Sequence, residues 1–211
     1  MASPSLKSVN LDNESVRQIL RAAFDQWSRH GFHGVSLREI ASAAGVSKSL
    51  VHYHFTSKEH LLLELQVDWS RKVALEVREQ LSALPPSPAA ALTAVEQVWD
   101  SMVAARAHFP FRLELWRQSV GNAVVLERLR EADLQLREIY SDGISAALGP
   151  FAAYLAVPVP RAAALLHTVL EGIALRLFIE PDLASVRTIF DDAKAFFIPA
   201  VLPVMRGSPA P

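Results

Sequence analysis

Two short helical segments separated by a glycine constrain this chain more than any other feature of its sequence. The first segment begins at Ser36, where Ser36 and Glu39 form a capping-box pattern that predicts a helix start. Gly45 tolerates the left-handed backbone that can end this helix and turn the chain. Ser47 then offers a second N-cap oxygen, which predicts another short helix over residues 48–55. Two short helices joined by a tight turn with glycine form a helix-turn-helix, whose second helix can lie in the major groove of DNA.

The second of these helices carries many hydrogen-bonding groups on one face. Val51 and Phe55 can pack inward, whereas most of the remaining side chains are polar. An ordinary helical hairpin with a solvated polar face is the alternative interpretation. If the helix reads DNA, the candidates for contact with base edges are Lys48, Ser49 and Tyr53. The candidates for phosphate contacts, which set register rather than sequence, are Ser36, Arg38, Ser47, His52, His54 and Lys58.

The run GVSKSLVHYHFTSKEHL, from Gly45 to Leu61, resembles the TetR family of transcriptional regulators. That family typically has a Gly-Val-Ser turn, a short recognition helix that ends in aromatic or His residues and Phe, and a Ser-Lys-Glu-x-Leu helix start. The upstream run SLREIASAAG is also similar to the family pattern. The chain departs from it at His52, where Tyr is more common, and at Thr56, where Pro is common. Because His52 can still donate to a phosphate, the departure bears on operator choice rather than on DNA binding.

Composition argues against several other classes of protein. The chain has no cysteine, which removes disulfides and thiolate metal sites. Residues 1–15 contain no continuous apolar core, so we expect no signal peptide. The most apolar runs, 162–170 and 196–205, are short and interrupted by polar residues or proline, so we expect no membrane span. A cytoplasmic location without a membrane partner follows as an expectation.

The distribution of charge is more informative than the net charge of −1. Residues 1–60 are mildly basic and contain most of the histidines, whereas the rest of the chain is correspondingly acidic. A basic end on an acidic body fits a protein that touches DNA with one end only.

Catalytic motifs are missing from the sequence. It contains no nucleophile elbow, no phosphate-cradling glycine loop and no HExxH run. His52 and His54 are two positions apart, so on a helix they face different directions and cannot easily share a metal. We therefore expect no enzyme, no cofactor and no metal site.

Apolar residues recur at helical spacing along the whole chain, which predicts an all-α fold of about nine helices. The proline-rich run at 85–88 breaks this pattern and predicts a domain boundary. The expected organisation is a flexible tail over 1–10, a three-helix helix-turn-helix domain over 11–56, a connecting helix over 57–84, an effector-binding and dimerisation domain over 88–204 and a flexible tail over 205–211.

Aromatic, methionine and polar residues on the later helices predict an apolar cavity with a few polar groups, the general form of a small-ligand site. The resemblance also implies an effector pocket in this region. Plain core packing is the alternative, and His167 and Glu171, one helical turn apart, could simply pair with each other. The candidates for effector contact are Trp99, Met102, Val103, Arg106, Phe111, Trp116, His167 and Glu171.

The last two helical segments, 161–179 and 185–202, are apolar over broad faces. A two-fold DNA site requires two recognition helices about 34 Å apart, which favours a homodimer. The resemblance likewise implies an interface on the last two helices, although they could instead form the core of a monomer. The candidates for dimer contact are Gly172, Leu175, Ile189, Phe190 and Phe197.

Together these patterns predict a ligand-responsive regulator of transcription. We expect a repressor that a small-molecule effector releases from a palindromic double-stranded DNA operator. Two alternatives remain at this point: a dimeric DNA-binding protein without an effector, and a helical protein-interaction module.

Overall fold

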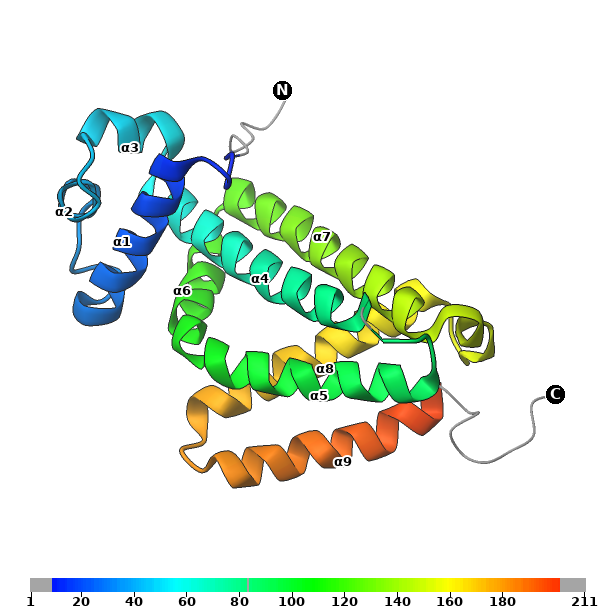
Figure 1. The fold of residues 1–211 in the computed structure, drawn as a ribbon. Coiled ribbons are helices and arrows are strands. Elements are labelled where there is room, and N and C mark those ends of the chain that lie inside the picture. Colours follow the sequence, from blue (N-terminus) through cyan, green and yellow to red (C-terminus); the bar gives the residue numbers. More distant parts are fainter. Residues whose placement is uncertain (1–8, 83, 202–211) are drawn as a thin grey trace. The chain divides into compact units, whose positions relative to one another are not determined.

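The computed structural model describes residues 9–82 and 84–201, which form nine α-helices and two short 3-10 helices (Figure 1). Within these ranges the chain forms no β-strand, and the predicted all-α class is confirmed. The α-helices are α1 (Glu14–His30), α2 (Leu37–Ala43), α3 (Lys48–His54), α4 (Lys58–Ser82), α5 (Pro88–Ala105), α6 (Phe109–Ser119), α7 (Ala123–Leu148), α8 (Val159–Ile179) and α9 (Leu183–Val201). The 3-10 helices are η1 (Arg106–His108) and η2 (Gly149–Tyr154).

Side-chain caps set the start of several helices. The Asn13 side chain accepts hydrogen bonds from the backbone at the start of α1. At α2 the predicted capping box is present: the Glu39 amide donates to Ser36 Oγ at 3.3 Å, and the Ser36 amide donates to Glu39 Oε2 at 2.7 Å. Ser57 and Ser87 accept from the first turns of α4 and α5 in the same way. Because a cap satisfies amides that the helix itself leaves unpaired, these bonds favour a helix start at each position, and α2 begins where its capping box predicts.

The chain divides into two compact units that differ from the expected domains. The first unit comprises Met1–Ser70 and Pro110–Asp133, and the second comprises Arg71–Phe109 and Leu134–Pro211. The division therefore falls within α4 and α7 rather than at the proline-rich run. The reason is that residues of α6 and of the start of α7 pack into the core of the first unit.

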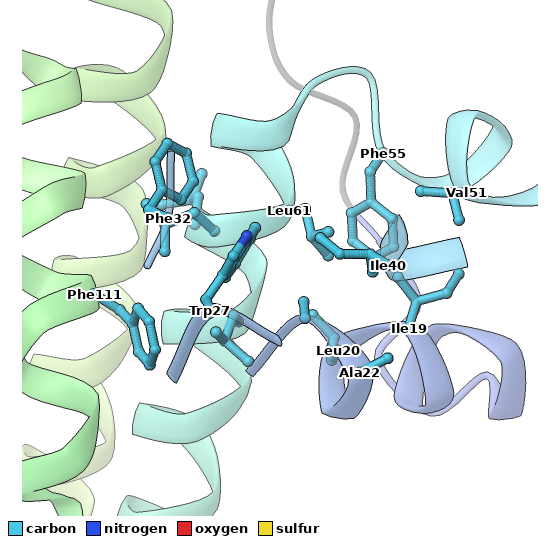
Figure 2. Close-up of a cluster of buried hydrophobic side chains, with 14 of the residues drawn as sticks. Ile19, Leu20, Ala22, Trp27, Phe32, Ile40, Val51, Phe55, Leu61 and Phe111 are labelled. Atoms are coloured by element: carbon cyan, nitrogen blue, oxygen red, sulfur yellow. The ribbon is translucent and has the colours of Figure 1, made fainter. Parts of the chain in front are cut away.

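The core of the first unit is built around Trp27, which is almost fully buried (Figure 2). Its ring centroid lies 5.1 Å from that of Phe32 and 6.2 Å from that of Phe111. Ile40 of α2 and Val51 of α3 are fully buried in the same core. Burial of each of these large side chains contributes about 1.5–3 kcal/mol. One apolar core therefore holds α1, α2 and α3, and residues of α4, α6 and α7 complete it.

The core of the second unit joins α5, α8 and α9. The Trp99 and Phe190 ring centroids are 5.1 Å apart, and Leu170 of α8 is buried beside them. α8 and α9 pack side by side (Figure 1).

The sequence of α8 is long and apolar enough to cross a membrane by length and composition, contrary to the expectation from its shorter apolar run. A mostly buried core helix passes the same test, whereas 28% of this stretch of α8 is buried. By its contacts with α9, α8 is a helix of the second unit.

Candidate nucleic-acid interface

The turn between α2 and α3 has the geometry that the helix-turn-helix pattern predicts. Gly45 adopts a φ of 67°, in the left-handed region. The Val46 amide donates to the Ala41 carbonyl at 3.0 Å, which closes the turn behind α2. Ser47 Oγ then accepts from the Leu50 amide at 3.1 Å and starts α3. Each of these bonds is local, so the turn follows from the residues within it.

α3 has one buried face and one exposed face. Val51 within α3 and Phe55 at its end are fully buried in the core of the first unit. Tyr53 is 67% exposed, although a side chain of its size usually buries most of its surface. The exposed residues of the turn and of α3 are Ser47, Lys48, Ser49, His52 and Tyr53. The structure thus places the expected base-contacting residues together on the solvent side of one short helix.

His54 differs from the other predicted contact residues. Its ring is half-buried, and Nε2 lies 3.1 Å from Ser15 Oγ in α1. His54 therefore ties the end of α3 to the start of α1. A structural role within the first unit fits this position better than a primary phosphate contact.

The remaining phosphate candidates lie at two other helix starts. Ser36 and Arg38 are exposed at the beginning of α2, where Ser36 is engaged with Glu39. Lys58 begins α4 and is half-buried, with Nζ 4.5 Å from the centroid of the Phe32 ring. Burial lowers the pKa of the Lys58 ammonium from its ordinary value, although nearby carboxylates oppose this effect.

A buried polar network supports the loop between α3 and α4. The Thr56 amide donates to His60 Nδ1 at 3.1 Å. One turn along α4, Glu64 Oε1 lies 3.7 Å from His60 Nε2 and accepts from Arg128 Nη2 of α7 at 3.1 Å. His60 and Glu64 are fully buried, and Arg128 nearly so. We did not predict this network, although a glutamate inside the apolar run at 61–66 was a signal that a buried partner was needed.

The second unit contains an apolar cavity of about 170 Å³. Residues of α4, α5, α7, α8 and α9 line it, and apolar atoms contribute almost all of its wall. None of the residues expected to contact the effector is among those that line this cavity. The predicted contacts are mostly aromatic and polar residues, whereas the wall consists mainly of Ala, Leu, Val and Ile at helical spacing.

The expected effector residues have other surroundings. Trp99 packs on Phe190, and Met102 and Val103 pack against the same core. Phe111 belongs to the core of the first unit, and Trp116 and Arg106 are exposed. His167 Nε2 lies 3.1 Å from Glu171 Oε1. These two residues therefore pair with each other, which was the alternative to contact with an effector.

The expected dimer residues are divided between surface and core. Gly172, Leu175 and Ile189 are exposed, whereas Phe190 is buried within the second unit. The Phe197 side chain lies outside the described residues. The exposed large apolar side chains of α8 and α9 are Leu165, Leu175, Phe178, Ile179, Ile189 and Phe196.

Metal binding finds no support in the described part of the chain, where no three His, Cys, Asp or Glu residues come together in a way that could hold an ion.

Comparison with known proteins relates the first unit to a family of regulators. Residues 19–65 match the family described as "Bacterial regulatory proteins, tetR family". The HTH-type transcriptional regulator RutR of Escherichia coli strain K12 is 51% identical over 47 residues, which are 22% of this chain and 22% of that protein. The first curated relatives are matched over only about a fifth to a quarter of their own length. Since the matched family is one of regulatory proteins, it agrees with the expectation that the chain is not an enzyme.

Solved structures resemble nearly the whole chain. The fatty acid degradation regulator FadR from Bacillus halodurans has a TM-score of 0.69 at 18% identity and covers 89% of this chain and 96% of its own. A protein from Saccharomonospora viridis, solved in complex with choline, has a TM-score of 0.64 at 19% identity and covers 87% of this chain and 96% of its own. At such low identity these likenesses establish the fold.

Proposed function

Because this chain belongs to the TetR family of bacterial regulatory proteins, we propose that it binds a double-stranded DNA operator and regulates transcription. The observation that carries this proposal is the exposed face of α3, where Lys48, Ser49 and Tyr53 face solvent while Val51 anchors the helix in the core. A short helix held in this way can enter the major groove with its polar face toward the bases.

The residues of this face divide into two roles. Lys48, Ser49 and Tyr53 contact base edges. The residues that hold phosphates are Ser36, Arg38, Ser47, His52 and Lys58. His54 supports the helix through its contact with Ser15. Phosphate contacts fix the position of the helix-turn-helix domain on the duplex, and base contacts select the sequence.

The protein acts as a homodimer on a palindromic operator. The exposed apolar side chains of α8 and α9, including Leu175, Ile189 and Phe196, support an interface on these helices. Apolar surface of this kind is costly to leave in water. A dimer supplies the two recognition helices that two half-sites require.

The protein is a repressor that works in the cytoplasm and is released from DNA by a small molecule in the cavity of the second unit. A cavity of about 170 Å³ is a departure from close packing, which supports an effector site over the alternative of a solid dimerisation core. The neighbour solved with choline indicates that this fold can hold a small molecule. Effector binding shifts the population away from the DNA-binding conformation.

A gel shift with DNA from upstream of the protein's own gene tests the proposal. We expect a shifted complex at low salt, and its absence would favour a protein-interaction module instead.

Two variants test which residues contact bases and which contact phosphates. Tyr53→Ala should remove about 1–3 kcal/mol of discrimination between operator and mutated operator, as loss of one base contact does. Arg38→Ala should weaken binding to all sequences and reduce the slope of log affinity against log salt by about 1. Tyr154→Ala, which alters an exposed tyrosine of η2, is the control and should bind as wild type. Equal loss of discrimination in the Tyr53 and Arg38 variants would contradict the assignment.

A further inference from the structure

The wall of the cavity in the second unit has few groups that could form hydrogen bonds with a polar ligand. Its residues include Val95 of α5, Ile144 of α7 and Leu166 of α8, and apolar atoms contribute almost all of its surface. A polar group that is moved from water into such surroundings without a hydrogen bond costs about 1–3 kcal/mol, and an isolated charge costs far more. The part of a ligand that fills this cavity is therefore hydrocarbon.

Two lining residues, Arg78 and Lys194, carry a positive charge. Lys194 is already neutralised, because Nζ lies 2.7 Å from Asp191 Oδ1 and is also bonded to Glu96. Arg187 completes this network, with Nη2 2.6 Å from Glu96 Oε2 and Nε 3.0 Å from Asp191 Oδ2. The hydrogen bonds from Arg187 and Lys194 lower the pKa of Asp191 to about 2, so both carboxylates stay charged at neutral pH.

This network bears on the charge of the ligand. Arg187 and Lys194 are paired with Glu96 and Asp191, so the charges of the network balance. A ligand carboxylate near Lys194 would add a third negative charge beside these two carboxylates. A ligand cation would gain little from the network either, because both carboxylates already bind Arg187 and Lys194. Arg78 is exposed, so its guanidinium can remain in water while its stem lines the wall. The arrangement favours an uncharged ligand.

The size of the cavity limits the ligand as well. A cavity of about 150 Å³ lined by apolar side chains in another protein holds one benzene molecule. The cavity here measures about 170 Å³. By this comparison it encloses about seven non-hydrogen atoms of a ligand, and because it is partly open, the end of a longer chain can extend out of it.

We infer that the cavity takes an uncharged, predominantly hydrocarbon molecule of about this size, such as a medium-chain alcohol or a small alkylbenzene. The inference rests on the proposal that the cavity is the effector site, and it adds the chemical class of the effector.

Calorimetry on the full-length protein without DNA tests the charge preference. Three probes with the same eight-carbon chain are compared: 1-octanol, octanoate and octylammonium. We expect 1-octanol to bind at least tenfold more tightly than either charged probe. From 1-butanol to 1-octanol the affinity should rise about fourfold with each methylene, as burial of a CH₂ group predicts. Octanoate or octylammonium binding as tightly as 1-octanol, or no binding by any probe, would overturn the inference.

A matched pair of variants on α5 tests the location. Ala91→Phe fills part of the cavity and should weaken 1-octanol binding at least tenfold, whereas Ala89→Phe changes an exposed alanine outside the wall and should leave binding unchanged. Circular dichroism checks that both variants fold, and Ala94→Leu, at another wall position, replaces Ala91→Phe if that variant does not. Undiminished binding in the folded wall variants would place the ligand elsewhere and overturn the inference.

The outcomes separate this inference from the proposed function. Binding of 1-octanol by a protein that shifts no DNA would support the ligand class and count against the regulator. A shift with operator DNA by a protein that binds none of the probes would support the regulator and overturn the ligand class.

Discussion

At the scale of single residues, the buried pair of Glu64 and Arg128 joins α4 to α7. The two residues are 64 positions apart in sequence, and Arg128 donates twice to Glu64 Oε1, at 3.2 and 3.1 Å. Glu64 is fully buried, so removal of the guanidinium leaves its carboxylate without water and with only the His60 imidazole, 3.7 Å away, beside it. That loss is costly in a way that a surface pair is not.

We expect Arg128→Ala to lower the free energy of unfolding by about 3–5 kcal/mol. The control is Arg130→Ala, which removes an exposed pair with Glu127 at 3.2 Å and should cost less than about 1 kcal/mol. Urea unfolding followed by circular dichroism measures both. Similar losses in the two variants would mean that the buried pair contributes no more than the exposed one.

The contrast between two glycines shows how a helix end differs from a helix interior. Gly45 ends α2 with a φ of 67°, whereas Gly172 lies within α8 and has open space where a Cβ would be. Gly45→Ala should destabilise the protein by about 1–2 kcal/mol, because an L-residue resists the left-handed region. Gly172→Ala should raise the stability of the isolated protomer by up to about 1 kcal/mol through helix propensity. Thermal unfolding at low protein concentration measures both, and a neutral Gly45→Ala would show that the turn relaxes.

Helix starts could be predicted from the sequence because a cap depends on residues only three positions apart. Ser36, Ser47 and Ser57 each accept from an amide in the first turn of the helix that follows. The turn at Gly45 is local for the same reason, and so is the exposed face of α3. These features define most of the candidate interface with DNA.

Contacts between distant segments could not be predicted in this way. Phe111 was expected in a ligand pocket, but it packs on Trp27, which is 84 positions earlier in the sequence. A cavity was predicted, but its lining was not, because small and aliphatic residues from five helices form the wall and each of them resembles an ordinary apolar helix face in the sequence. Periodicity shows that a helix has an apolar face, and it does not show which neighbour that face meets.

At the scale of the whole molecule, the apolar surface of α8 and α9 determines whether one protomer or two act on DNA. Ile189 is 43% exposed on α9, and Leu134 is 54% exposed on α7. Both are large aliphatic side chains on the surface of a helix, so substitution of either by glutamate should change protomer stability little. Only Ile189 belongs to the proposed interface.

We therefore expect Ile189→Glu to shift the protein from dimer to monomer in sedimentation velocity at micromolar concentration, while Leu134→Glu remains a dimer. A glutamate in an apolar interface is buried without a counter-ion, which costs several kcal/mol for each copy. The same Ile189 variant should lose most of its affinity for a two-half-site operator, since a monomer presents one recognition helix, yet keep the wild-type affinity for a single half-site. A dimeric Ile189→Glu protein with full operator affinity would show that the second subunit meets a different surface.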